Sequence, residues 1–299
     1  MKKSNTLGQE AIARKGWLLA NRFLLLRRLS QLSILVLFLL GPWAGIWILK
    51  GNLSSSLFVD SIPLTDPFVL LQSLTSGHIP LLQAFIGVAL VLLFYIVVGG
   101  RVFCSWVCPI NLITDAAAWC RRKLKLRKES IMSSQWRYWI LAMAILLPLF
   151  TGVMTWELIN PVSVFHRGLF FGMGLGWILF FMIFLFDLLA VENGWCGHLC
   201  PVGAFYSILN KISFIKVDAI NREQCSDCLD CFNVCPEPEI LKGPVNGQKK
   251  GIATLVNGMS CTNCGRCIDV CAENVFVITT VFNGENGLKK VNKLGGEIK

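Results

Sequence analysis

Charged residues are scarce in this chain of 299 residues, and that scarcity is the first constraint on its class. Asp, Glu, Lys and Arg make up 15% of the sequence, whereas hydrophobic residues make up 54%. A soluble globular domain carries about 25% charged residues. The composition therefore argues against an ordinary soluble domain and indicates a membrane protein.

No nucleic-acid-binding motif is present, although the formal net charge is +10. An excess of Lys and Arg can indicate binding to nucleic acid, binding to anionic lipid, or the orientation of the chain in a membrane. The basic residues lie beside apolar segments, so topology and lipid headgroups explain the charge, and a nucleic-acid partner is not expected. The first apolar run begins late, is long and lacks a small-x-small cleavage site, so a cleaved signal peptide is not expected.

Four apolar runs are long enough to cross a bilayer, which requires about 20 mostly apolar residues. They cover residues 29–49, 80–98, 138–156 and 169–191. Lys and Arg concentrate before the first run and between the second and third, where RRKLKLRK occupies 121–128. Because cytoplasmic segments are enriched in Lys and Arg, we predict a multi-pass membrane protein with both termini and the middle connection in the cytoplasm. A partner-binding surface is the alternative role for the basic run.

Two copies of a Cys-x-x-x-Cys-Pro pattern, the CxxxCP motif, follow the second and fourth apolar runs. The first copy contains Cys104 and Cys108, and the second contains Cys196 and Cys200. A two-span unit returns the chain to its starting side, so its duplicate has the same orientation, as in a parallel repeat. All four thiols are then expected at the cytoplasmic edge of the membrane, where they converge if the halves pack about a pseudo-twofold axis. They suit an iron–sulfur or other soft-metal site, or reversible dithiol chemistry, and packing at a helix end is the remaining alternative.

Eight of the 13 cysteines form two Cys-x-x-Cys-x-x-Cys-x-x-x-Cys runs near the C-terminal end. This spacing is typical of bacterial two-cluster ferredoxins, in which the fourth cysteine of each run ligates the other cluster. The spacing predicts one [4Fe–4S] cluster on Cys225, Cys228, Cys231 and Cys271. It predicts a second cluster on Cys261, Cys264, Cys267 and Cys235. Zinc is the alternative for Cys-x-x-Cys pairs, but two complete four-cysteine runs favour clusters.

These features divide the chain into four predicted parts. They are a basic cytoplasmic arm (1–28), a four-span membrane domain (29–210), a two-cluster ferredoxin domain (217–282) and a polar tail (283–299). The expected fold class is an α-helical membrane protein with four transmembrane helices in a duplicated two-span unit, followed by a small α+β ferredoxin domain. The segment 237–258, between the cysteine runs, is rich in Gly, Pro, Asn and Lys, which predicts a solvated loop or short hairpin.

Several stretches beyond the cysteine runs carry a resemblance to a known family. They are GPWAGIWILKGNLSSS at 41–56, PLTDPFVLLQSLTSGH at 63–78, FCSWVCP at 103–109, WELINPVS at 156–163 and GWCGHLCPVGA at 194–204. Over about residues 17–280 the chain resembles the NapH family, the membrane ferredoxin-type subunits of periplasmic nitrate reduction systems. The cysteine motifs alone are shared with other families, among them a nitrous-oxide respiration regulator and a cytochrome oxidase assembly protein.

The resemblance implies an electron-transfer subunit of a quinol dehydrogenase rather than a stand-alone enzyme. Electrons would pass from quinol to the periplasmic polyferredoxin NapG and on to a periplasmic nitrate reductase. The tetrahaem cytochrome NapC and the ferredoxin-type protein NapF are further expected partners. Two alternatives stay open: a membrane anchor and assembly scaffold with redox-sensing clusters, and a cytoplasm-facing metal reductase that uses the membrane-edge thiols. The resemblance in the outer loops favours the electron-transfer and scaffold functions over the third.

Quinol oxidation releases protons, so the implied function requires a proton acceptor. Ionisable residues inside membrane spans are rare and are functional candidates. Asp187, near the end of the fourth run, is one candidate, and Glu157 and His166, at the outer ends of the third and fourth runs, are the others. For Glu157 and His166, a wet position at the interface is the alternative. For Asp187, the alternative is a position high enough to reach water or to pair with an arginine. His198, within the second CxxxCP motif, is a candidate for tuning a thiol, with a packing role as the alternative.

Overall fold

The computed structural model describes residues 7–126, 132–246 and 253–282, and the statements below concern those residues. The described chain forms two compact units. Unit 1 combines the described residues of 1–29, 95–106 and 207–299, and unit 2 consists of those of 30–94 and 107–206. The ferredoxin cysteines therefore share a unit with the start of the chain and with the segment that carries Cys104.

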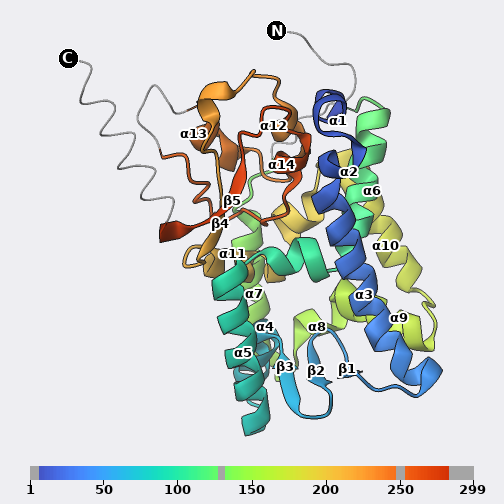
Figure 1. Cartoon of the computed structure of the whole chain (residues 1–299). Helices are drawn as coiled ribbons and strands as arrows, with labels where there is room; N and C mark the ends of the chain where they lie inside the picture. Colours follow the sequence, from blue (N-terminus) through green and yellow to red (C-terminus); the bar gives the residue numbers. More distant parts are fainter. Residues whose placement is uncertain (1–6, 127–131, 247–252, 283–299) are drawn as a thin grey trace. The chain divides into compact units, whose positions relative to one another are not determined.

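Helices dominate the chain between residues 22 and 210 (Figure 1). They are α3 (Arg22–Ala44), α4 (Pro67–Thr75), α5 (Leu82–Val98), α6 (Ile110–Lys123), α7 (Trp136–Thr151), α8 (Thr155–Ile159), α9 (Pro161–Phe171), α10 (Gly176–Leu185) and α11 (Pro201–Asn210). Three π-helical turns accompany them: η1 (Phe103–Val107), η2 (Phe186–Ala190) and η3 (Trp195–Leu199). Such turns are rare and occur often at functional sites.

The four predicted spans are matched only in part by apolar helices. Within the described residues, α3 alone is long and apolar enough to cross a membrane, while α5, α7 and Gly176–Ala190 are shorter apolar helices. The third run is not one helix, because α7 ends at Gly152, whose φ is 67°. The fourth run is divided by Gly172 and Gly174, at φ 86° and 46°, so α10 begins only at Gly176.

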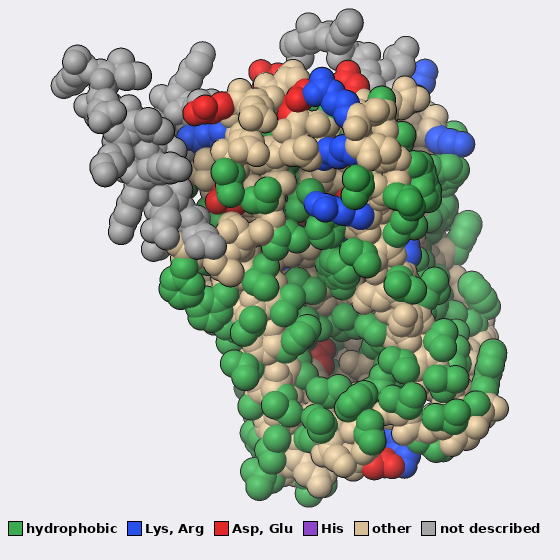
Figure 2. Space-filling model, in the orientation of Figure 1, with side chains coloured by type: hydrophobic (Ala, Val, Ile, Leu, Met, Phe, Trp, Pro, Cys, Tyr) green, Lys and Arg blue, Asp and Glu red, His purple; other side chains and the backbone are tan. Residues whose placement is uncertain are grey.

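Large hydrophobic side chains are exposed on the helices of unit 2. Trp43, Phe150, Phe171 and Leu175 are each at least 80% exposed. Figure 2 shows hydrophobic side chains over a wide part of the face drawn. Soluble monomers rarely expose apolar patches larger than a few hundred Å². This surface is therefore of the kind that contacts lipid or a partner chain.

The connection between α3 and α5 is folded, although the sequence predicts no element there. It contains an antiparallel sheet of β1 (Leu49–Gly51), β2 (Ser55–Phe58) and β3 (Ile62–Thr65), with β2 in the middle. The short helix α4 follows and packs on α7, where Gln72 Nε2 donates a hydrogen bond to the Ala144 carbonyl oxygen at 3.0 Å. Phe68 and Gln72 are fully buried. Helix α4 is thus packed inside unit 2 and is not part of a solvated loop.

Unit 1 contains the α+β arrangement expected of a ferredoxin domain. Strands β4 (Ile215–Asp218) and β5 (Val277–Thr280) pair antiparallel, and the short helices are α12 (Asp230–Val234), α13 (Glu239–Asn246) and α14 (Arg266–Val270). Its core includes Val217, Leu241, Val256, Ile268 and Phe276, all at most 4% exposed. The sheet and helices bury this core between the two cysteine runs.

Helix α13 corrects the prediction of a solvated loop or hairpin over 237–258. Leu241 and Val245 lie four residues apart, hence on one face of the helix, and both are buried in the core. Burial of that face outweighs the local effect of Pro244 within the helix. Residues 247–252, the tail 283–299 and the end of the basic run at 127–128 lie outside the described residues.

The N-terminal segment packs within unit 1 from Gly8 onward, whereas the sequence predicts a separate basic arm. It forms α1 (Gln9–Lys15) and α2 (Trp17–Ala20) before α3 begins. The Gly8 N–H donates to Asp230 Oδ2 at 3.0 Å. The N–H groups of Phe23 and Leu24, at the start of α3, donate to the carboxylate of Asp269. Both acids lie in the cysteine runs, so the described part of the predicted arm (1–28) contacts both runs within unit 1.

Candidate functional site

Two cavities in unit 1 are each lined by four cysteines. One is lined by Cys225, Cys228, Cys231 and Cys271, and the other by Cys235, Cys261, Cys264 and Cys267. We name them the Cys225 cavity and the Cys261 cavity. Their empty space, part of it open to solvent, is about 410 and 390 Å³. Each cavity takes three cysteines from one run and one from the other, which is the exchange that the spacing predicts.

The exchange follows from the local structure of each run. The first two cysteines lie on a loop that ends in a left-handed residue, Leu229 (φ 63°) or Gly265 (φ 71°). A five-residue helix, α12 or α14, then carries the chain to the fourth cysteine, which caps its C-terminal end. Because α12 and α14 pack on each other, the fourth cysteine of each run reaches the cavity of the other.

The two cavities fit iron–sulfur clusters better than single metal ions. Within the described chain, no three or more His, Cys, Asp or Glu side chains are arranged to hold one metal ion. A zinc site would draw its four ligands to about 2.0–2.3 Å from one point. Here the sulfurs surround an empty space instead, and thiolates are the donors that iron–sulfur clusters use.

Burial in the cavities favours the protonated, neutral form of most of these cysteines when no metal is bound, and Cys264 is an exception. Burial raises the pKa of the Cys231 thiol to about 12, and the neighbouring Cys225 and Cys228 add to the rise. Burial also raises the pKa of Cys261 to about 11. At Cys264, burial is outweighed by Arg266 and Arg27, and the pKa is lowered. Iron binding would therefore release protons from these cysteines, as is general for thiolate ligation.

The two CxxxCP motifs have the same local structure. In each, the first cysteine lies in a π-helical turn, η1 or η3, and the Cys-Pro pair leads into a helix, α6 or α11. Cys104 belongs to unit 1, whereas Cys108, Cys196 and Cys200 belong to unit 2. The convergence of these four thiols stays a prediction.

Glu157 lies in a polar network of unit 2. Its carboxylate accepts hydrogen bonds from Ser54 Oγ at 3.3 Å, from Asn160 Nδ2 at 3.1 Å and from Ser163 Oγ. Ser54, Asn160 and Ser163 are buried. This environment holds the carboxylate in a defined orientation.

His166 and Asp187 are buried, so the alternative of a wet interfacial position does not apply to them. The His166 ring packs against Phe38 and Phe170, with centroids 5.1 and 4.7 Å apart. Asp187 is fully buried, and its Oδ1 accepts the N–H of Trp195, the residue before Cys196, at 2.8 Å. Within the described residues, His166 Nε2 and Asp187 Oδ2 have no hydrogen-bond partner. Among the described residues, no hydrogen bond, ion pair or ring contact joins Glu157, His166 and Asp187 to one another.

Asp66 was not singled out from the sequence, yet it joins the Glu157 network. Its Oδ1 accepts the Phe68 N–H at 3.0 Å and the Tyr206 hydroxyl at 3.1 Å, and its own N–H donates to the Ser54 carbonyl oxygen at 2.8 Å. Burial raises the pKa of Asp66 to about 6, the two hydrogen bonds lower it, and Glu157 adds to the rise. The Asp-Pro pair before α4 signals a helix cap in the sequence. Nothing in the sequence signals the contact with Tyr206, which lies 140 residues away.

Models of known protein families match three segments of the chain. A model described as a 4Fe-4S binding domain matches residues 81–127 and 173–217, and each match contains one CxxxCP motif. A 4Fe-4S dicluster domain model matches residues 217–272, which contain both ferredoxin runs.

Curated relatives cover almost the whole chain. The ferredoxin-type protein NapH of Haemophilus influenzae is 51% identical over 92% of this chain and 96% of its own length. NapH of Escherichia coli K12 is 49% identical over 91% of this chain and 94% of its own length. The methylamine utilization ferredoxin-type protein MauN of Methylorubrum extorquens is 47% identical over 80% of this chain and 83% of its own length. No solved structure matches the chain.

Proposed function

Because the chain belongs to the family of NapH ferredoxin-type proteins, we propose that it carries electrons from membrane quinol toward a periplasmic nitrate reductase. The pair of four-cysteine cavities in unit 1 is the observation that supports an electron-transfer role. A [4Fe–4S] cluster bound in each cavity would supply one-electron chemistry. In this proposal the chain's own residues hold these centres and accept the protons that quinol releases.

The proposed setting is the bacterial inner membrane, with four spans and both termini in the cytoplasm. The long apolar helix α3, the three shorter apolar helices and the exposed hydrophobic surface of unit 2 support it. The shorter apolar helices can still serve as spans where protein buries the polar, non-helical backbone that continues beyond their ends. Helix α4, which packs on α7, covers part of unit 2 in this way. The distribution of Lys and Arg supports the orientation.

The proposed partners are NapG, NapC and NapF. They are assigned because NapH relatives cover more of the chain, at slightly higher identity, than MauN, whose name places it in methylamine utilization. NapG, as periplasmic polyferredoxin, is the direct electron acceptor in this scheme. A membrane anchor and assembly scaffold is the second candidate function, and a thiol-based metal reductase is the third.

The proposed proton acceptors are Asp66, Glu157, His166 and Asp187. Clusters accept electrons alone, so the two protons of quinol pass to protein groups. Asp66 and Glu157 are two carboxyl groups in one hydrogen-bonded network. Burial, with a further contribution from Glu157, raises the pKa of Asp66, so Asp66 retains a proton more readily than an exposed carboxylate. Tyr206 lies on α11, which begins directly after Cys200. Asp66 is thus tied to a helix that starts at the second CxxxCP motif.

The proposed function is tested by anaerobic reduction with a quinol analogue. The purified chain is oxidised mildly and mixed with the quinol, alone and with NapG, and cluster absorbance and EPR are recorded. We expect reduction in the wild type and its loss when Cys104, Cys108, Cys196 and Cys200 are all changed to serine. Cys120→Ser, a cysteine outside every motif, is the matched control. No reduction even with NapG would reject the quinol role and favour the scaffold, while loaded iron or copper reduced at these thiols without NapG would favour the metal reductase.

Asp66→Asn should slow quinol-driven cluster reduction by about 10²–10⁴-fold, the usual contribution of a general base. The asparagine oxygen still accepts the Phe68 N–H, so the start of α4 is preserved. Asp60→Asn is the control, because Asp60 lies in the same connection but is exposed and paired with Lys50. Equal rates for wild type and Asp66→Asn in stopped-flow measurements would exclude Asp66 as an acceptor.

A further inference from the structure

Within unit 1, the part of the first CxxxCP motif at residues 104–106 is hydrogen-bonded to the loop that carries Cys261 and Cys264. Ser105 Oγ donates to the Thr262 carbonyl oxygen at 2.8 Å, and Trp106 Nε1 donates to the Asn263 carbonyl oxygen at 3.2 Å. Ser105 is 2% exposed, so its bond is shielded from solvent. The two residues that follow Cys104 thus contact the two residues that follow Cys261.

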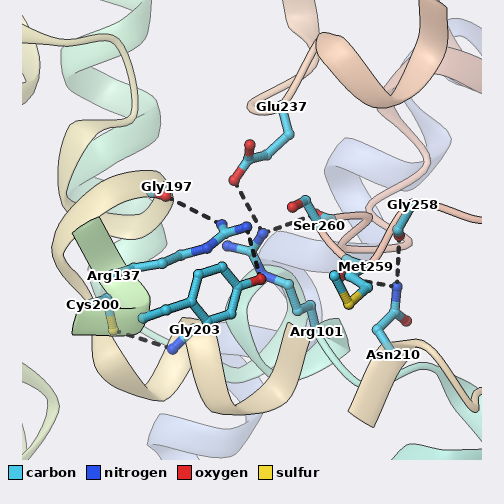
Figure 3. Close-up of polar contacts among 11 residues, drawn as sticks. Arg101, Arg137, Gly197, Cys200, Gly203, Asn210, Glu237, Gly258, Met259 and Ser260 are labelled. Carbon is cyan, nitrogen blue, oxygen red and sulfur yellow. Dashed lines mark hydrogen bonds and ion pairs between the residues drawn. The ribbon is translucent and has the colours of Figure 1, made fainter. Parts of the chain in front are cut away.

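The same loop is held from three further points of unit 1. Asn263 Nδ2 donates to the Val98 and Ile215 carbonyl oxygens at 3.2 and 2.8 Å. Asn210, at the end of α11, donates to the Gly258 carbonyl oxygen at 3.2 Å (Figure 3). Its Oδ1 accepts the Gly100 N–H at 3.1 Å. A Cβ on Gly99 would overlap Asn263, and its φ of 134° also disfavours a side chain. The 98–106 segment and the Cys261 loop are therefore built to fit each other closely.

Arg101 places a buried positive charge beside this loop. Its Nη1 lies 2.9 Å from the Ser260 carbonyl oxygen and 3.2 Å from Glu237 Oε1 (Figure 3). The Arg101 side chain is 2% exposed and that of Glu237 is 12% exposed. Ser260 and Glu237 line the Cys261 cavity. Solvent therefore screens this charge weakly from whatever the cavity binds.

The charges that line the two cavities differ. Asp227 and Glu273 line the Cys225 cavity. Glu273 pairs with Arg14, but the Arg14 side chain is 58% exposed, so solvent screens its charge far more than that of the buried Arg101. Arg266 and Glu237 line the Cys261 cavity, and Arg101 neutralises Glu237. Reduction adds one negative charge to a cluster, so nearby cations stabilise the reduced form and nearby anions oppose it. The Cys261 cavity thus favours reduction more than the Cys225 cavity.

We infer that the cluster of the Cys261 cavity is the one that exchanges electrons with the first CxxxCP motif, and that Arg101 gives it the higher reduction potential of the two. Arg101 is a positioning and charge-setting residue, because it touches the cavity wall. In this exchange, one electron would pass from a redox centre held by the CxxxCP thiols, which quinol would reduce, to the oxidised cluster. The donor centre would be oxidised and the cluster reduced, with no bond or proton changed at the cluster. The inference rests on the proposed function in assuming two bound clusters.

The test is an EPR-monitored redox titration of the purified full chain with dithionite and mediators. Cys264→Ser and Cys228→Ser identify the signals of the Cys261 and Cys225 cavities. We expect Arg101→Gln to lower the reduced-to-oxidised ratio of the Cys261-cavity cluster roughly tenfold at its wild-type midpoint. Arg101→Lys should retain most of the wild-type ratio, because the positive charge is kept. Glu237→Gln should raise the reduced-to-oxidised ratio of the same cluster, because it removes a negative charge.

Lys15→Gln is the matched control for the other cavity. Lys15 lies near Cys271 and donates a hydrogen bond to the Ile268 carbonyl oxygen, so its loss should shift the Cys225-cavity cluster alone. Equal shifts of both clusters in Arg101→Gln, or no shift in either Arg101→Gln or Glu237→Gln, would overturn the inference. The titration uses dithionite and mediators instead of quinol, so its result does not depend on whether quinol reduces the clusters. A chain that contains no iron before the titration overturns both proposals.

Discussion

Cys235→Ser should remove the cluster of the Cys261 run, although Cys235 belongs to the other run in sequence. Cys235 lines the Cys261 cavity with Cys261, Cys264 and Cys267. Serine is a poor ligand for iron at this site, so the variant should retain roughly half of the wild-type iron, one cluster of two. Iron analysis and EPR of the anaerobically purified chain measure the loss.

Single-ligand variants of each cavity show which cluster is lost. The remaining signal of Cys235→Ser should match that of Cys264→Ser and differ from that of Cys228→Ser. Cys271→Ser should give the reciprocal result, because Cys271 lines the Cys225 cavity. If Cys235→Ser instead resembled Cys228→Ser, each run would ligate its own cluster and the crossed assignment would be rejected.

Gly265→Ala should destabilise unit 1 by about 2–5 kcal/mol, from two causes. The φ of Gly265 is 71°, a conformation that costs an L-residue about 1–2 kcal/mol. A Cβ there would also overlap the ring of Phe23 in α3, and overpacking of this kind costs about 1–3 kcal/mol. The measurement is the denaturant concentration at which half of the cluster absorbance is lost, compared with wild type.

Leu229→Gly is the matched control for Gly265→Ala. Leu229 precedes α12 as Gly265 precedes α14, and its φ is 63°. Its side chain is 41% exposed, so its removal leaves little cavity. Relief of backbone strain should make this variant as stable as wild type or more stable, by up to about 1 kcal/mol. An unchanged midpoint for Gly265→Ala would contradict the prediction, because it would mean that neither the positive φ nor the overlap with Phe23 costs free energy.

Features encoded by short spacings were predictable from the sequence. The two four-cysteine runs, the duplicated CxxxCP motif and the α+β class of the ferredoxin part follow from residues within about ten positions of one another. The family resemblance over almost the whole chain was also correct. In these cases the local backbone geometry is set by neighbouring residues, so pattern and structure agree.

Features that depend on burial were predicted less well. The segment after Glu237 reads as a loop because of its Gly and Pro content, yet Leu241 and Val245 gain more from the core than the helix costs. The third and fourth apolar runs satisfy a length criterion, but glycines with positive φ end or divide their helices. Hydropathy records the polarity of side chains and does not record where the backbone turns.

By itself, the sequence determined which residues are candidates for the chemistry: eight cysteines with cluster spacing and four at the ends of apolar runs, in a chain with few charges. Only the tertiary structure decided which of them meet. The contacts of Trp106 with Asn263, of Phe23 with Gly265 and of Asp66 with Tyr206 join residues more than 100 positions apart. Such contacts arise from the packing of whole helices and loops, which residue spacing does not encode.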